Sequence, residues 1–178
     1  MRALRLTAFA LMAAGTALVA SALYIPAKAA LAQVLLERAW ARTQAGEGAV
    51  RPWPWADISP VAVLEVPRLG ERSIVLEGAS GQAMAFGPGH MINTPPIGAR
   101  GTAVIAAHRD TQFSYLRNVK TGDRSVVETA DGTHNAFRVV EARVVRADAS
   151  GLDPTEGGPT GARLALVTCY PFDGVLRG

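Results

Sequence analysis

The sequence has 178 residues, enough for one folded domain of ordinary size behind a short N-terminal segment. Its formal net charge is +3 at pH 7 and falls to +1 when Arg2 and Arg5, which precede the first apolar segment, are set aside, so the charge excludes the basic surface that nucleic-acid binding requires. Cys169 is the single cysteine, which excludes an intramolecular disulfide.

The first predicted element is an uncharged apolar segment over residues 6–25, LTAFALMAAGTALVASALYI. As an α-helix its 20 residues would span about 30 Å, the thickness of the hydrocarbon core of a bilayer. A cleaved signal peptide is the alternative, because Ala27-Lys28-Ala29 resembles a small-x-small cleavage site; however, the segment exceeds the apolar stretch of about 7–15 residues that is typical of signal peptides. We therefore predict an uncleaved transmembrane anchor over residues 1–26, and either alternative exports the remainder of the chain.

Residues 27–50 are predicted to form a juxtamembrane helical linker. The apolar positions within residues 31–36 give a helical stripe, which predicts a helix over Ala27–Thr43. Gly46 and Gly48 are expected to end this helix, because glycine readily takes the backbone angles of a helix C-terminus. The linker thus leads from the anchor into the rest of the chain.

The catalytic domain is predicted over residues 51–178 and opens with the strap RPWPWAD at 51–57. Two prolines in the strap prevent a regular helix, and its two tryptophans can pin an extended chain to a surface. The strap is therefore expected to be a packed connection rather than a regular element.

Short runs rich in β-branched residues then recur at a spacing typical of an antiparallel, all-β domain. Asp131-Gly132 fits the turn of a hairpin between two of these runs. Residues 81–86 and 113–119 are long enough only for short helices. The predicted strands are Val61–Val66, Ser73–Leu76, Thr102–Ala107, Ser125–Thr129, Phe137–Val145 and Arg163–Thr168.

Two side chains that could take part in catalysis each come directly after an apolar predicted strand. Cys169 follows residues 163–168, and His108 follows residues 102–107. A single cysteine beside a strand is more often an inert small hydrophobe, so Cys169 alone predicts nothing. Cysteine catalysis also needs a group that holds the thiolate and then passes a proton to the departing amine, and imidazole suits that task. His108 and Cys169 are therefore the candidate catalytic pair.

The other two histidines predict no chemistry. His90 lies in a glycine-rich turn and His134 lies beside the predicted hairpin, so both are expected to be surface or structural residues. The three histidines are 18 and 26 residues apart, and the cysteine has no C-x-x-C companion. This spacing predicts no metal site.

These motifs resemble those of the sortase family. The sequence LVTC at 166–169 resembles the sortase TLxTC signature, and AHRD at 107–110 is similar to the end of its histidine strand. The resemblance spans residues 52–169, and the order and separation of the two motifs make it specific.

Three further segments resemble the sortases of Gram-negative bacteria, class GN: RPWPW at 51–55, VLEGAS at 75–80 and TCYPF at 168–172. This resemblance implies a single-pass protein of the inner (cell) membrane with its catalytic domain in the periplasm. Arginines and lysines flank the apolar segment on both sides, so charge alone does not set the orientation.

The family resemblance implies an eight-stranded closed β-barrel and a reaction at an LPxTG-like sorting signal of a protein substrate. The thiol of Cys169 would attack the Thr–Gly bond and form a thioester with the substrate threonine. His108 would protonate the leaving amine and deprotonate the incoming amine acceptor, whose identity the sequence leaves open. Such a reaction needs no cofactor.

The family normally continues after the cysteine through a loop and a last strand, whose arginine holds the substrate and the developing oxyanion. Arg177 is the only arginine after Cys169, and the sequence ends at Gly178. We therefore expect a sortase truncated after the cysteine strand, and leave open whether the last strand is present and whether Arg177 replaces that arginine. Ala107 stands where many relatives have glycine, and its methyl group either crowds the site or has no effect.

Three functions remain in parallel. The first is an active cysteine transpeptidase. The second is a catalytically impaired, membrane-anchored module with the sortase fold that binds a peptide without turnover. The third is a thiol protease of another lineage, which would release a free acid without preference for an added amine.

Overall fold

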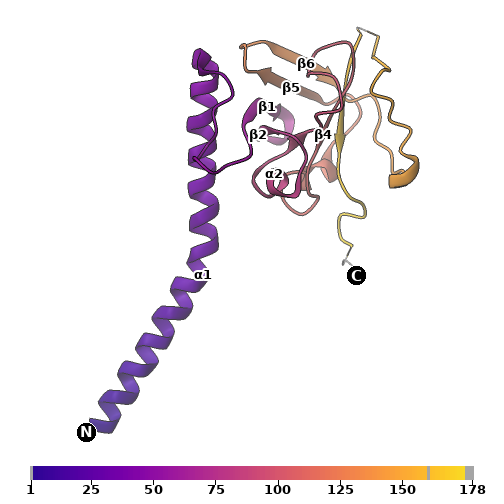
Figure 1. Ribbon diagram of the computed structural model, residues 1–178. Coiled ribbons are helices and arrows are strands. Elements are labelled where there is room, and N and C mark those ends of the chain that lie inside the picture. Colours follow the sequence, from indigo (N-terminus) through magenta and orange to yellow (C-terminus); the bar gives the residue numbers. More distant parts are fainter. Residues whose placement is uncertain (1, 160, 175–178) are drawn as a thin grey trace.

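The computed structural model describes residues 2–159 and 161–174. A long helix, α1 (Arg2–Arg42), leads into a β-domain in which the described residues form one seven-stranded sheet (Figure 1). The strands are β1 (Pro60–Val66), β2 (Glu71–Glu77), β3 (Gly89–His90), β4 (Gly101–Ala106), β5 (Arg124–Thr129), β6 (His134–Arg138) and β7 (Ala162–Val167). The helical segments are η1 (Thr43–Glu47), η2 (Pro67–Leu69), α2 (Gly81–Phe86), η3 (Ser114–Asn118) and η4 (Ala147–Ala149).

The sheet has the order β6-β5-β1-β2-β3-β4-β7. The pairs β2–β3 and β4–β7 are parallel and the others are antiparallel, so the prediction of a purely antiparallel domain was wrong for these two pairs. Parallel neighbours need a crossover connection, and the connection from β4 to β7 passes through β5 and β6. Strand spacing along the sequence does not reveal such a crossover.

The sheet curls around one interior. Leu64 of β1 and Phe113, which precedes η3, belong to one buried cluster. Phe137 from the edge strand β6 and Leu166 from the opposite edge strand β7 pack against that same cluster. Because both edges reach one core, the sheet is a nearly closed barrel, and the predicted all-β fold with short helices is confirmed.

Most predicted elements lie within two residues of the observed ones, but β6 does not. It was predicted over Phe137–Val145, whereas the observed strand ends at Arg138. The hairpin fixes its position, because Glu128 pairs with His134 directly after the turn. Val139 still exchanges backbone hydrogen bonds with Gly122 and Asp123, and the described chain beyond it at 140–146 lies outside the strand and keeps apolar side chains in solvent.

Helix α1 continues through Pro26 instead of restarting after it. A proline inside a helix removes one hydrogen bond and pushes away the carbonyl four residues earlier, which accounts for a bend in α1 (Figure 1). The stretch from Leu11 onward is long and apolar enough to cross a membrane, and only 6% of its most apolar window is buried. Gly46 and Gly48, both at positive φ, end the helical region as predicted.

The last turns of α1 pack on the outer face of the barrel. The buried positions on the helix are Ala32, Leu36, Ala39 and Trp40, which recur at helical spacing. They do not form the stripe expected within residues 31–36, because Leu31 and Val34 are exposed. Leu36 and Trp40 share a second core with Val63 of β1 and Leu76 of β2, so this half of the predicted linker packs against the barrel.

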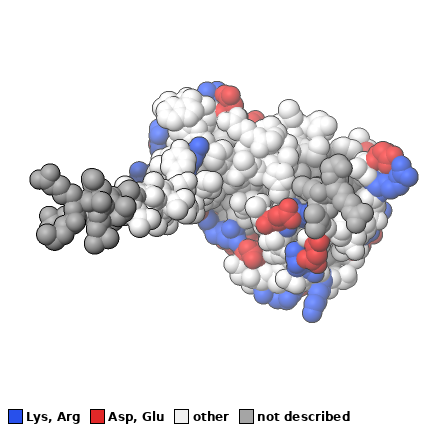
Figure 2. All heavy atoms as spheres, turned by 90° about the horizontal axis from the view of Figure 1, so that it is seen from below, with Lys and Arg blue, Asp and Glu red and all other residues white. Residues whose placement is uncertain are grey.

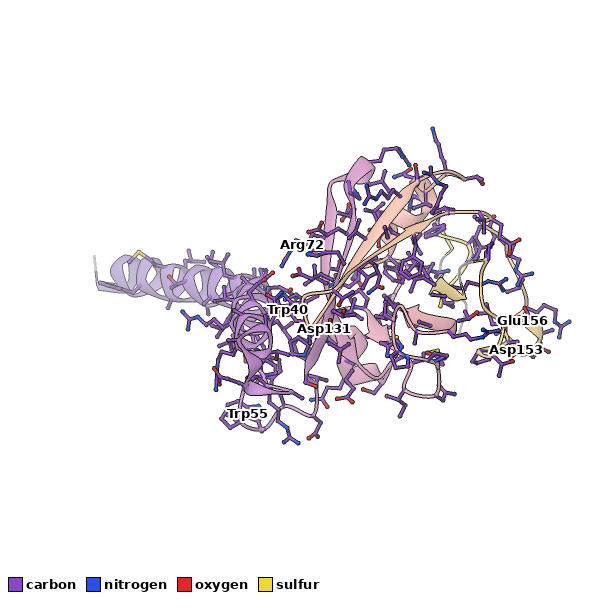
Figure 3. All side chains as sticks on the ribbon, turned by 90° about the horizontal axis from the view of Figure 1, so that it is seen from above. Trp40, Trp55, Arg72, Asp131, Asp153 and Glu156 are labelled. Atoms are coloured by element: carbon purple, nitrogen blue, oxygen red, sulfur yellow. The ribbon has the colours of Figure 1, made fainter. Side chains whose placement is uncertain are left out.

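Polar contacts fix the same interface. Arg72 donates two hydrogen bonds to Glu37 of α1, and Trp40 and Arg72 lie where the helix meets the sheet (Figure 3).

In the strap, Trp53 packs edge-on against Phe86 at 5.1 Å between ring centroids, whereas Trp55 is exposed. Seen from below, acidic and basic residues are interspersed over the domain (Figure 2).

Leu36→Ala tests the docking of α1. The side chain of Leu36 is fully buried, so its loss should lower the free energy of unfolding by about 2–5 kcal/mol. Leu31→Ala is the matched control, because Leu31 is 58% exposed on the same helix and its loss should change stability by less than about 0.5 kcal/mol. Urea unfolding of the full chain in mild detergent measures both, and equal costs would show that α1 is not docked.

Candidate active site

The site is created by the register between two parallel strands. Ala106 at the end of β4 pairs with Val167 at the end of β7. His108 and Cys169 each follow two residues after that pair, so both lie at the same edge of the barrel, just past the paired ends of the two strands. Both residues are exposed. The structure thus places the two residues that the sequence singled out just beyond the paired ends of neighbouring strands, although 61 positions separate them.

Two hydrogen bonds continue the strand pairing up to this pair. The backbone N–H of Ala107 donates to the carbonyl of Val167 at 3.2 Å. The hydroxyl of Thr168 donates to the carbonyl of Ala107 at 2.8 Å, a role that its place in the motif did not predict. The Ala107 side chain is 5% exposed and belongs to the barrel core, so its methyl group lies inside the barrel and does not crowd the exposed site.

The loop after His108 is anchored in the core. The carbonyl of His108 accepts hydrogen bonds from the N–H groups of Thr111 at 3.4 Å and Phe113 at 3.1 Å. Phe113 is fully buried and packs edge-on against Tyr115, with 5.8 Å between the ring centroids. Burial raises the pKa of Tyr115, so its phenol stays neutral. This packing fixes the backbone of His108 while its side chain stays accessible.

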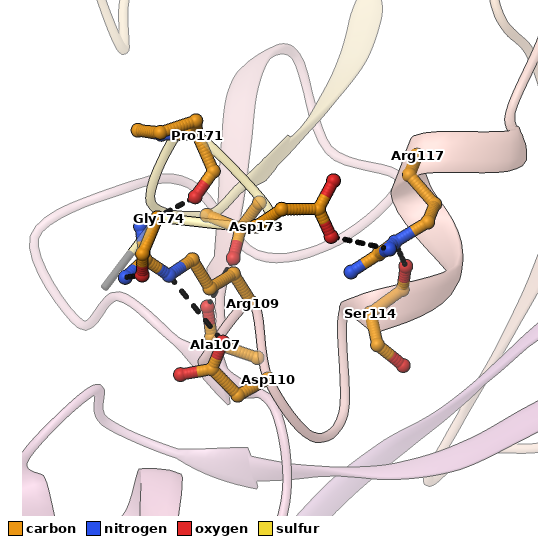
Figure 4. A network of polar contacts seen from close by, with 9 residues as sticks. Ala107, Arg109, Asp110, Ser114, Arg117, Pro171, Asp173 and Gly174 are labelled. Atoms are coloured by element: carbon orange, nitrogen blue, oxygen red, sulfur yellow. Dashed lines mark hydrogen bonds and ion pairs between the residues drawn. The ribbon is translucent and has the colours of Figure 1, made fainter. Parts of the chain in front are cut away.

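Arg109 ties the histidine loop to the loop that follows the cysteine (Figure 4). Its side chain is 8% exposed and lies 3.4 Å from the carboxylate of Asp110. Nη1 donates to the carbonyl of Pro171 at 2.5 Å and Nη2 donates to that of Gly174 at 2.7 Å. Because its donors bind backbone carbonyls, Arg109 is a positioning residue. Sequence reasoning missed this role, since backbone partners leave no residue pattern.

A second arginine holds the same loop from the surface. Arg117 of η3 makes an ion pair of 3.0 Å with Asp173, and its guanidinium lies 5.2 Å from the centre of the Phe172 ring. Phe172 in turn packs edge-on against Tyr170, directly after the cysteine. The described part of this loop is therefore held by Arg109, directly after His108, and by Arg117 of η3.

The other two histidines lie on β3 and β6, and one further candidate lies outside the described residues. His90 sits in β3, with Nε2 3.0 Å from the carbonyl of Pro95. His134 opens β6, where its side chain is 64% exposed and 3.9 Å from Glu128. Arg177 lies outside the described residues. Within residues 2–159 and 161–174, no cluster of three or more His, Cys, Asp or Glu side chains could hold a metal ion.

Comparison with known proteins gives consistent matches. A protein-family model described as the sortase domain matches residues 64–177. Among curated proteins, sortase D of Bacillus subtilis (strain 168) is 26% identical over 110 residues, which cover 62% of this chain and 54% of that protein. The match therefore spans about half the length of that relative.

Solved structures match over more of their length. Sortase E from Streptomyces avermitilis is 31% identical with a TM-score of 0.53, over 64% of this chain and 81% of that one. A sortase D5 transpeptidase from Clostridium perfringens has a TM-score of 0.62 at 18% identity, over 80% of this chain and 91% of that one. The latter likeness shows the fold, and the predicted sortase-type barrel behind an N-terminal apolar helix is confirmed.

Arg109→Met tests the clamp on the loop after the cysteine. Methionine keeps an apolar stem but leaves the carbonyls of Pro171 and Gly174 without their donor, which should cost about 1–3 kcal/mol of stability and speed hydrogen exchange at residues 172–174. Arg117→Met removes an exposed pair and should cost no more than about 1 kcal/mol. Urea unfolding with exchange mass spectrometry separates them, and a smaller effect from Arg109→Met would refute the clamp.

Proposed function

The chain belongs to the sortase family, and we propose that it is an active cysteine transpeptidase with Cys169 as the nucleophile and His108 as its acid–base partner. Sortases are cysteine transpeptidases. The observation that carries the proposal is the parallel register of β4 and β7, which puts an exposed imidazole and an exposed thiol at the same barrel edge.

The proposed reaction begins when the Cys169 sulfur attacks the carbonyl carbon of the Thr–Gly bond in an LPxTG-like sorting signal. The carbon–nitrogen bond breaks, His108 gives a proton to the departing amine, and the substrate threonine remains on Cys169 as a thioester. An amine acceptor then attacks the thioester while His108 takes its proton, and the thiolate leaves. No cofactor enters these steps.

The residues around the pair would serve this reaction by holding its geometry. Thr168 and Arg109 fix the backbone on both sides of Cys169, so the thiol would need little rearrangement to reach a bound peptide. Arg177 is the candidate for contact with the developing oxyanion, because a guanidinium offers a permanent charge and several donors. This assignment comes from its place in the sequence.

We place the protein within class GN, as a single-pass protein of the inner membrane with its catalytic domain in the periplasm. The support is the resemblance of three sequence segments to that class and the exposed apolar half of α1. The proposed division is an anchor at 1–26, a linker at 27–50 and a catalytic domain at 51–178. The buried residues of the linker suggest that the domain should be studied with α1 attached.

A sortase-fold module that binds a peptide without turnover is the second candidate. One observation favours it: the donors of Arg109, the buried arginine beside the cysteine loop, are bonded to loop carbonyls and not aimed at a substrate. Such a module would bind the sorting signal and form no thioester.

The intact mass of the full chain in detergent, after incubation with an LPxTG-like peptide, tests the proposal. A gain equal to the acyl fragment is expected, and it must lie on Cys169 if Cys169→Ala abolishes it. Adding oligoglycine should remove the adduct faster than water does; release at the same rate would indicate a hydrolase. Peptide binding with no mass gain would contradict turnover and support the binding module.

A further inference from the structure

Helix α1 is fixed to the barrel along its last turns, so it is not a flexible tether. Leu36 and Trp40 are buried in the core shared with the sheet. Three polar contacts flank them: Gln33 donates to the carbonyl of Phe86 at 2.8 Å, Glu37 pairs with Arg72, and Gln44 donates to Glu128 at 2.6 Å. The direction of the helix therefore determines the direction of the whole domain.

These contacts show which part of the domain lies beside which part of the helix. Gln33 meets the end of α2, and Gln44, 11 residues later, meets the end of β5, which corresponds to about 16 Å of helix. Gly46 and Asp131 line one shallow hollow, so the β5–β6 hairpin lies at the end of α1 that is remote from the apolar segment. Figure 3 shows Asp131 near this junction.

The catalytic edge lies toward the opposite end. From Phe86 the chain passes to Gly89, which pairs with Ala106, two residues before His108. Figure 1 shows β4 and β7 on the far side of α2 from the helix, with the chain after β7 running in the direction of the N-terminal half of α1. The edge that carries His108 and Cys169 therefore faces the same way as the apolar half of the helix.

The separation from a bilayer would be short. Gln33 lies eight positions after Ile25, the end of the apolar segment, which corresponds to about 12 Å of helix. Among the described residues, the face toward that end carries both signs of charge (Figure 2), which does not favour a strong attraction to anionic lipid. Orientation would thus come from the docked helix.

We propose that the docking of α1 holds the catalytic edge toward the bilayer surface and the β5–β6 hairpin away from it. Peptides then reach Cys169 through the space between the barrel and the lipid headgroups. The proposal rests on the membrane anchor and on the catalytic edge of the proposed function, but its geometry does not depend on turnover.

Energy transfer to lipid measures this geometry in the full chain. The lone thiol of Cys169 is labelled with a membrane-impermeant fluorescent maleimide in vesicles whose lipid headgroups carry an acceptor dye. The matched variant Cys169→Ala/His134→Cys carries the same dye on the hairpin side, where His134 is 64% exposed. Transfer should be more efficient from position 169 than from position 134.

Equal transfer, or stronger transfer from position 134, would overturn the proposal. Flotation of the labelled protein with the vesicles is the control for insertion, and a chain that fails to float contradicts the anchor itself. Because neither readout needs a substrate, an inactive protein can still support the orientation, and an active one can still contradict it.

Insertion of seven helix-forming residues between Lys28 and Ala29 tests the rigid coupling. Seven residues add nearly two turns, so they preserve the docked face and lift the domain by about 10 Å. Transfer should fall at both labelled positions while position 169 stays the closer one. Unchanged transfer from position 169 would mean that the domain finds the membrane independently of α1 and would refute the mechanism.

Discussion

The parallel pairing of β4 with β7 is the constraint on which the rest of the site depends. Side chains alternate across a strand, so a slip of one residue would exchange the inner and outer sets. Leu164 and Leu166 would leave the barrel core, and the alternation after β7 would be inverted at Cys169. The core therefore fixes the register, and the register fixes the positions of the proposed catalytic pair.

The domain has two cores that share its central strands. Ala62 and Leu64 of β1 face the barrel interior, whereas Val63 between them faces α1. Burial on both faces accounts for the nearly continuous apolar sequence of β1. Through this strand the docked helix and the barrel interior are packed against one another, so the proposed anchor and the proposed site belong to one body.

Much of this organisation is visible in the sequence, for reasons that individual residues make clear. Apolar runs that stop at His108 and Cys169 mark strand ends directly, and Asp131-Gly132 marks the hairpin. The crossover that makes β4 and β7 parallel leaves no local pattern. Arg109 also escaped prediction, because its partners are backbone carbonyls that any residue could supply.

The rate of thioester formation in His108→Ala tests the central pairing most directly. With the full chain and one LPxTG-like peptide, loss of an acid–base group should slow formation by about 10²–10⁴-fold. His134→Ala, which removes an exposed histidine from the hairpin side, should react like the native chain. Equal rates in the two variants would contradict a catalytic pair built by the β4–β7 register.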